Sequence, residues 1–177
     1  VVNEDDVYII GGAGDTKHEA TAWENIFQLT EPGKYWLDTG LYLEYEKAKS
    51  SGSPDKLEAK LLLEKPVANY LHTANFVLDR QVGTNHSNET GFEFAWRSKY
   101  RLKPSFEPGI ELYWAPGDID NFKRASEQEL SIGPVIGGKF ALGNKRKLRY
   151  EVGYLHGLND ATARDTWKAL LEYEFRF

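Results

Sequence analysis

Hydrophobic and polar residues alternate with a period of two along most of this chain. In the stretch Trp167–Phe177 every second position is apolar, and most of the positions between them are charged. Successive side chains of a β-strand point to opposite faces, so this pattern predicts a strand with one apolar and one charged face. Similar alternation occurs in the ranges 35–46, 56–64, 90–101, 105–114 and 147–157, and in each of these five ranges one row carries no charge.

About ten strands are predicted, and their connections alternate between short and long. Tight links are expected at 31–34, 65–69, 102–105 and 142–146, with longer polar stretches between them. The first strand is expected at Asp6–Gly12, followed by 22–30, 68–80, 129–142 and 167–177 among the others. Antiparallel neighbours joined in this way place all short turns at one end and all long loops at the other. Gly133 and Pro134 predict a bulge or sharp bend in the range 129–142.

Composition narrows the class of protein. The 177 residues fit one domain, 1–177, and the fold class predicted is all-β. No stretch approaches the roughly 18 apolar residues of a spanning helix, but membrane β-barrels lack such stretches too. The net charge of −5, without a basic patch, argues against nucleic-acid binding, and the absence of cysteine excludes disulfides and thiolate chemistry. Because methionine is also absent, the chain is expected to follow a removed segment; a secretory signal peptide and trimming explain this equally well.

Two architectures fit the alternating rows. In a soluble lipid-binding barrel of the lipocalin or fatty-acid-binding type, the apolar row would point inward; in a membrane barrel it would face lipid. Aromatic residues at the strand ends favour the membrane barrel, because aromatic girdles mark both membrane interfaces. The residues expected near the short turns are Tyr35, Tyr70, Tyr100, Phe140, Phe175 and Phe177, and those near the long loops are Tyr45, Phe92, Trp114, Tyr154 and Trp167.

The last strand adds a resemblance. The chain stops on Phe177 after an aromatic-alternating strand, and this resembles the C-terminal assembly signal of Gram-negative outer-membrane proteins, which their insertion machinery recognises. The resemblance implies an antiparallel up-and-down transmembrane β-barrel with short periplasmic turns and long extracellular loops. It also implies an outer-membrane location, with membrane lipid and lipopolysaccharide as partners. It identifies a class of protein rather than a particular family.

The charged rows would then line the interior of the barrel. The lumen-lining residues predicted are Glu44, Glu46, Glu58, Lys60, Glu93, Arg97, Lys99, Glu111, Glu129, Lys139, Arg149, Glu151, Lys168, Glu172 and Arg176. A barrel of about ten strands is narrow, since open porins use 16–18. Two interpretations therefore remain open: a salt-bridged polar core, as in a structural membrane protein, or a small channel for polar solutes or ions. Both need the same residues.

Histidines raise a further alternative, an outer-membrane hydrolase. His86 and Ser87 are adjacent within Asn85–Asn88, but their spacing differs from the strand-borne motifs of outer-membrane lipid A deacylases and phospholipases, which favours a simple turn. Omptin-type proteases carry Asp and His at the outer rim of the barrel. The residues here that could form such a rim are His18, His86 and His156 with Asp15, Asp118, Asp120, Asp160 and Asp165. No pair has recognisable ligand spacing, so no catalytic residue, metal or cofactor is predicted. His72 falls on the apolar row near a short turn, where an interfacial role is expected.

Overall fold

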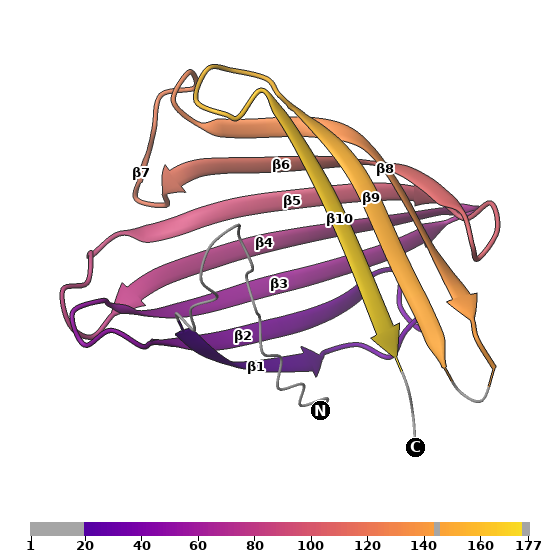
Figure 1. The fold of residues 1–177 in the computed structure, drawn as a ribbon, viewed down its shortest axis with the longest axis horizontal. Helices are drawn as coiled ribbons and strands as arrows, with labels where there is room; N and C mark the ends of the chain where they lie inside the picture. Colours follow the sequence, from indigo (N-terminus) through magenta and orange to yellow (C-terminus); the bar gives the residue numbers. More distant parts are fainter. Residues whose placement is uncertain (1–19, 144–145, 175–177) are drawn as a thin grey trace. The chain divides into compact units, whose positions relative to one another are not determined.

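The computed structural model describes residues 20–143 and 146–174, and it is all-β (Figure 1). Ten antiparallel strands form one up-and-down sheet in the order β1-β2-β3-β4-β5-β6-β8-β9-β10, with β7 paired to β6. The strands are β1 (Ala20–Gln28), β2 (Asp38–Ala48), β3 (Asp55–Val67), β4 (Tyr70–Val82), β5 (Thr90–Tyr100), β6 (Glu107–Asp118), β7 (Asn121–Phe122), β8 (Glu129–Ala141), β9 (Lys147–Gly157) and β10 (Asp165–Glu174). None of the described residues forms a helix long and apolar enough to cross a membrane.

The all-β class and the ten antiparallel strands confirm the sequence prediction, but the set of strands differs from the expected one. The two-residue strand β7 lies in the connection between β6 and β8, where no strand was expected. The strand expected at Asp6–Gly12 lies outside the described residues. The first described strand, β1, corresponds to the second strand predicted.

The chain divides into two compact units, which are described separately below. Among the described residues, the first unit comprises 20–63, 75–93 and 117–121, and the second comprises 64–74, 94–116, 122–143 and 146–174. The boundaries fall inside strands β3 to β7, so each of these strands contributes residues to both units.

The register of the first unit sorts the side chains of β1 and β2 by polarity. Trp23 pairs with Tyr45, and the next pair, Glu24 with Glu44, points to the opposite side of the sheet. We call the side that carries Trp23 and Tyr45 the apolar face and the side that carries Glu24 and Glu44 the charged face. Trp23 is 59% exposed, whereas Glu24 is only 7% exposed. The charged face is therefore the buried one.

The second unit repeats this inversion. Leu171 on the apolar face pairs with Tyr150, and its neighbour Leu170 pairs with Glu151 on the charged face. Leu171 is 71% exposed, while Glu111, on the charged face of β6, is 1% exposed. Glutamate is almost never fully buried unless it is paired, so Glu111 requires ionic partners on the charged face.

The charged face of the second unit is concave. Arg97 on β5 reaches Glu151 on β9, with 2.8 Å between Nη1 and Oε2, although β6 and β8 lie between these strands. Neighbouring strands are about 4.8 Å apart, so a flat sheet would separate the two backbones by about 14 Å. The contact therefore requires the sheet to curl around this face.

The connections are less regular than predicted. The link 29–37, expected to be tight, is longer than the link 49–54 at the other end of the sheet. Glu31 and Lys34 close a turn around Gly33, which has a φ of 71°, and Gly33 N donates to the Asp38 carboxylate. These side-chain and turn bonds replace ladder bonds, so β2 begins only at Asp38, and Tyr35 and Trp36 lie in the link.

The bend predicted near Pro134 is present, but no residue is inserted there. The β8–β9 ladder is interrupted between the pairs Ile132–His156 and Val135–Gly153, and two residues of each strand lie between these pairs. Pro134 has no N–H to donate, which explains the gap. β8 remains one strand and curves strongly (Figure 1).

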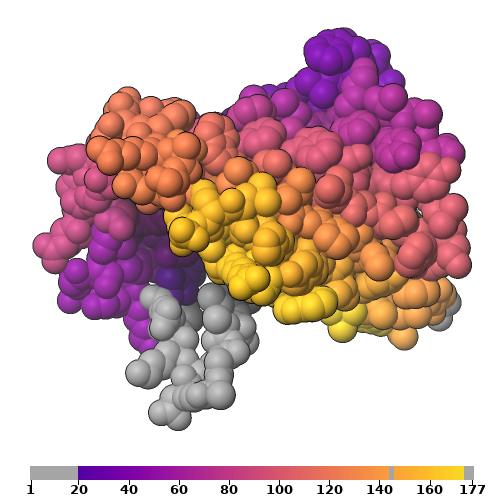
Figure 2. Space-filling view, turned by 90° about the horizontal axis from the view of Figure 1, so that it is seen from above, coloured from indigo at the N-terminus to yellow at the C-terminus, as the bar shows by residue number. Residues whose placement is uncertain are grey.

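Two of the longer connections of the second unit pack against each other. Asn159 Nδ2 donates to the backbone oxygens of Ala125 and Gln128, and Leu158 N donates to Leu130 O. The space-filling view shows the corresponding orange and yellow segments in contact (Figure 2). This end of the second unit is thus held by loop-to-loop hydrogen bonds.

Candidate functional site

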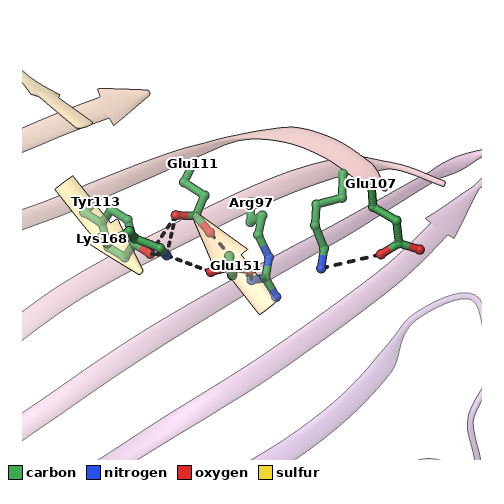
Figure 3. A network of polar contacts seen from close by, with 7 residues as sticks. Arg97, Glu107, Glu111, Tyr113, Glu151 and Lys168 are labelled. Atoms are coloured by element: carbon green, nitrogen blue, oxygen red, sulfur yellow. Dashed lines mark hydrogen bonds and ion pairs between the residues drawn. The ribbon is translucent and has the colours of Figure 1, made fainter. Parts of the chain in front are cut away.

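Four charged residues form a closed network on the charged face of the second unit (Figure 3). Lys168 Nζ lies 2.6 Å from Glu111 Oε2 and 2.9 Å from Glu151 Oε1. Arg97 Nη1 lies 2.8 Å from Glu151 Oε2 and 3.6 Å from Glu111 Oε1. Each cation therefore contacts both carboxylates, and the charges of the four groups cancel.

Glycines on β8 and β9 make room for this network. Glu111 faces Gly133, Glu151 faces Gly137, and Lys168 faces Gly153 across the strand ladders. A Cβ on Gly137 would lie 3.7 Å from Glu151 Oε2, and a Cβ on Gly153 would lie 3.1 Å from Lys168 Cγ, so these two glycines leave room for the charged side chains. A Cβ on Gly133 would meet the Tyr154 backbone oxygen instead, so Gly133 allows the backbones of β8 and β9 to approach closely. Gly133 was predicted only as a signal for a bend, and the room that Gly137 and Gly153 leave was not predicted. Glycines that alternate with apolar residues in neighbouring predicted strands are the signal that would have revealed it.

Tyr113 completes the hydrogen bonding of the network. Its hydroxyl donates to Glu111 Oε2 over 3.1 Å and accepts from Lys168 Nζ over 3.0 Å. Arg97 Nε is buried and has no hydrogen-bond partner among the described residues. Buried charges need complete pairing to avoid a large desolvation cost, so this guanidinium is less fully satisfied than the Lys168 ammonium.

Further ion pairs lie on the same face of the second unit. Lys99 Nζ is 3.8 Å from Glu107 Oε2, and Arg149 Nη1 is 3.6 Å from Glu172 Oε1. The Arg149 and Glu172 side chains are about half exposed, so this pair is much less shielded from solvent than the central network.

The charged face of the first unit has a different balance. Glu58 accepts ion pairs from Lys56 at 3.1 Å and from Lys60 at 2.6 Å. Lys60 also sits 4.3 Å above the ring of Tyr42, whose hydroxyl donates to Glu44. Tyr42 and Lys56 were not named among the predicted lumen-lining residues, although both lie within the alternating ranges 35–46 and 56–64.

The remaining predicted lumen residues lie in described strands but take no part in the ion pairs described above. Glu46 is in β2, Glu93 in β5, Glu129 and Lys139 in β8, and Lys139 pairs in register with Arg149. Arg176, Phe175 and Phe177 lie outside the described residues.

The predicted interface aromatics of the second unit form pairs. Tyr70 and Tyr100 meet edge to face with ring centroids 5.1 Å apart, near the link between β3 and β4. Tyr154 and Trp167 lie 5.0 Å apart near the opposite end of their strands, and Trp167 is 75% exposed. Trp114 Nε1 donates to Gln128 at that same end.

His72 belongs to the aromatic group near the β3–β4 link. Its ring stacks on Tyr70 at 6.1 Å and on Trp96 at 6.4 Å between centroids. The imidazole thus sits within an aromatic row on the apolar face.

The histidine and serine residues considered for a hydrolase site do not form a nucleophile–base pair in the described part of the chain. His86 Nδ1 contacts Gly83 O at 2.6 Å, while Ser87 Oγ accepts from Glu89 N, so each side chain is engaged with the local backbone. His156 Nδ1 does lie 3.4 Å from Asp165 Oδ1. Among the described residues, no group of three or more His, Cys, Asp or Glu side chains could hold a metal ion.

Asp55 forms a polar clamp at the loop end of β3. Its carboxylate accepts from Lys47 Nζ and Tyr45 OH at 2.7 Å each and from Ala48 N at 3.1 Å. Asp55 is the first of the 13 residues of β3. The hydrogen bonds from Lys47 and Tyr45 lower the pKa of Asp55.

Comparisons of this chain with protein-family models, with curated proteins and with solved structures find no match.

Proposed function

We propose that this chain is an outer-membrane β-barrel of a Gram-negative bacterium, with its apolar face toward lipid and its charged face toward a narrow lumen. In this proposal the charge network acts as the barrier of a small gated channel for ions or other small polar solutes. The observation that carries the proposal is the inverted burial, with Glu111 1% exposed and Leu171 71% exposed.

The apolar face supports the lipid-facing part of the proposal. Exposed hydrophobic side chains recur along it in both units: Trp23, Leu43 and Leu57 in the first and Ile136, Val152 and Leu171 in the second. An aqueous environment would penalise this exposure by roughly 25 cal/mol per Å² of apolar surface, whereas hydrocarbon would not. Paired aromatics near both strand ends match the girdles of membrane barrels.

The charge network supports the gated-channel part. Arg97 and Lys168 each contact both Glu111 and Glu151, so the pairs can exchange partners without leaving a charge uncompensated. Rings of charged side chains control selectivity in channels, and a compact neutral ring blocks passage until it rearranges.

Membrane insertion is tested by tryptophan fluorescence in vesicles that contain brominated lipid. Trp23 and Trp167 are largely exposed on the apolar face, so strong quenching is expected after refolding into such vesicles. A chain that instead folds to a compact monomer in plain buffer, without quenching, would belong to the soluble lipid-binding alternative.

Planar-bilayer recording tests the channel. The double variant Glu111→Ala/Lys168→Ala removes one anion and one cation from the network, and it should raise the conductance several-fold. The matched control is Arg149→Ala/Glu172→Ala, which makes the same charge change at an exposed pair on the same face and should leave the conductance near that of the parent. Silence of the folded parent and of both variants at all voltages would reject the channel and leave the structural role.

A further inference from the structure

A groove of about 550 Å³ lies in the first unit. Its apolar walls come from alternate positions of β1 to β4: Trp23, Phe27, Leu43, Tyr45, Leu57 and Leu78. Trp23 and Tyr45 pair across β1 and β2, which places the groove on the apolar face. Its volume falls within the range of about 300–1,000 Å³ that is usual for ligand sites.

Two short side chains explain why this surface is hollowed. Asn25 stands between Trp23 and Phe27 on the apolar row of β1, and Ala59 stands between Leu57 and Leu61 on β3. Side chains of one row are spaced by about 6.7 Å along a strand, so a short residue between two large ones leaves a depression. Asn25 and Ala59 both line the groove.

The three acidic residues that border the groove, Glu44, Glu58 and Asp79, belong to the charged row. Glu58 directs its carboxylate to Lys56 and Lys60, Glu44 accepts from Tyr42, and the Asp79 carboxylate lies over Gly91 on β5. These carboxylates lie on the charged face, so they do not oppose an anion on the apolar face.

A cation without a partner stands at one end of the groove. Arg80 is exposed, follows Leu78 by two positions on β4, and forms no hydrogen bond or ion pair within the described part of the chain. Lys47, on the apolar face of β2, differs because Asp55 neutralises it at 2.7 Å. The groove therefore combines apolar walls with one uncompensated guanidinium near the loop after β4.

We propose that this groove binds a net-anionic, phosphate-bearing membrane lipid, with an acyl chain against the apolar walls and the phosphate on Arg80. The inference rests on the proposed membrane location, because only then does the apolar face meet lipid. A guanidinium binds phosphate oxygens through two parallel hydrogen bonds. The headgroup of a zwitterionic lipid carries its own cation, which Arg80 repels, so a net-anionic lipid should bind more tightly. The charge of Arg80 thus selects the class of headgroup, and the shape of the groove selects the chain.

Native mass spectrometry of the full chain released from detergent micelles tests the inference. The probes are phosphatidylglycerol and phosphatidylcholine with identical acyl chains, added in equal amounts. We expect preferential retention of phosphatidylglycerol. Arg80→Gln should weaken that retention about tenfold and leave phosphatidylcholine unchanged, since one charge-assisted contact is lost. Ala59→Trp, which fills the groove, should reduce retention of both lipids.

Lys47→Gln is the matched control, because it removes a cation from the same face outside the groove, and lipid retention should stay within about twofold of the parent. Equal retention of the two lipids, or retention of phosphatidylglycerol that Arg80→Gln does not change, would overturn the inference. These outcomes are separable from failure of the membrane proposal, which would appear as unquenched tryptophan in brominated phosphatidylcholine vesicles.

Discussion

Lys168 on β10 contacts Glu111 on β6 across two intervening strands, with 2.6 Å between Nζ and Oε2. Glu111 is 1% exposed and also accepts from Tyr113. The charged face therefore has its own core, made of ion pairs and hydrogen bonds where a soluble protein would place aliphatic side chains. Such a core depends on complete pairing, because an unpaired buried charge is costly.

The first prediction follows from this dependence. Glu111→Gln removes the most buried carboxylate and leaves Arg97 and Lys168 to share Glu151, so the free energy of unfolding should fall by about 3 kcal/mol. Glu172→Gln breaks the half-exposed pair with Arg149, and its effect should stay below about 1 kcal/mol. Denaturant unfolding in lipid vesicles measures both. Equal losses for the two variants would show that the central network is no more shielded than the peripheral pair.

The second prediction concerns the glycines of β8. A Cβ on Gly133 would lie 1.8 Å from the Tyr154 carbonyl oxygen, a backbone atom that cannot move aside. Gly133→Ala should therefore lower the free energy of unfolding by about 3 kcal/mol or prevent folding. Gly137→Ala, on the same face of the same strand, meets its nearest atom at 3.5 Å and should change the free energy of unfolding by less than about 1 kcal/mol. A tolerated Gly133→Ala would mean that β8 and β9 are farther apart than described.

The alternation of residues was sufficient to predict nine of the ten described strands, all except β7, and to predict which side chains of a strand share a face. Leu171 and Glu172, for example, lie on opposite faces as expected, because successive side chains of a strand point to opposite faces. The lengths of the connections were harder to predict. The link 29–37 is extended by hydrogen bonds to Asp38 and Thr39, which the alternation of apolar and polar residues does not predict.

The partners within the charged face were beyond the sequence alone. Arg97 and Glu151 are 54 positions apart in the chain, and their contact depends on how strongly the sheet curls. The alternation of apolar and charged positions predicted that both residues lie on the charged face. It did not predict which carboxylate each cation would contact. The groove on the apolar face was missed for a similar reason, since it depends on the heights of side chains on four neighbouring strands.

The third prediction tests which face meets lipid, using two adjacent residues of β10. Leu171→Arg places a cation on the apolar face, and it should destabilise the protein in a bilayer by about 2–4 kcal/mol. Leu170→Arg places the same residue on the charged face, opposite Glu151, and should be tolerated to within about 1 kcal/mol. Folding into vesicles, followed by denaturant titration, measures both. A larger loss for Leu170→Arg than for Leu171→Arg would reverse the assignment of the faces.

The fourth prediction concerns the clamp at the loop end of β3. Hydrogen bonds from Lys47 and Tyr45 hold the pKa of Asp55 below its ordinary value of 3.8. The unfolded chain therefore binds more protons than the folded protein in this range. The stabilisation from Asp55 is complete above the unfolded-state pKa and is lost as the pH falls through the lower, folded-state pKa. Asp55→Asn should thus be less stable than the parent near neutral pH, and the difference should vanish in strong acid.

Denaturant unfolding of the parent and of Asp55→Asn across the acid range measures this difference. Asp160→Asn is the control for the substitution itself, because the Asp160 side chain forms no hydrogen bond or ion pair within the described ranges, and its free energy of unfolding at neutral pH should stay within about 0.5 kcal/mol of the parent. A difference for Asp55→Asn that persists unchanged below the folded-state pKa would mean that the shape of the carboxylate, rather than its charge, holds Lys47 and Tyr45 in place. In that event the clamp would act through packing, and acid would not loosen the connection between β2 and β3.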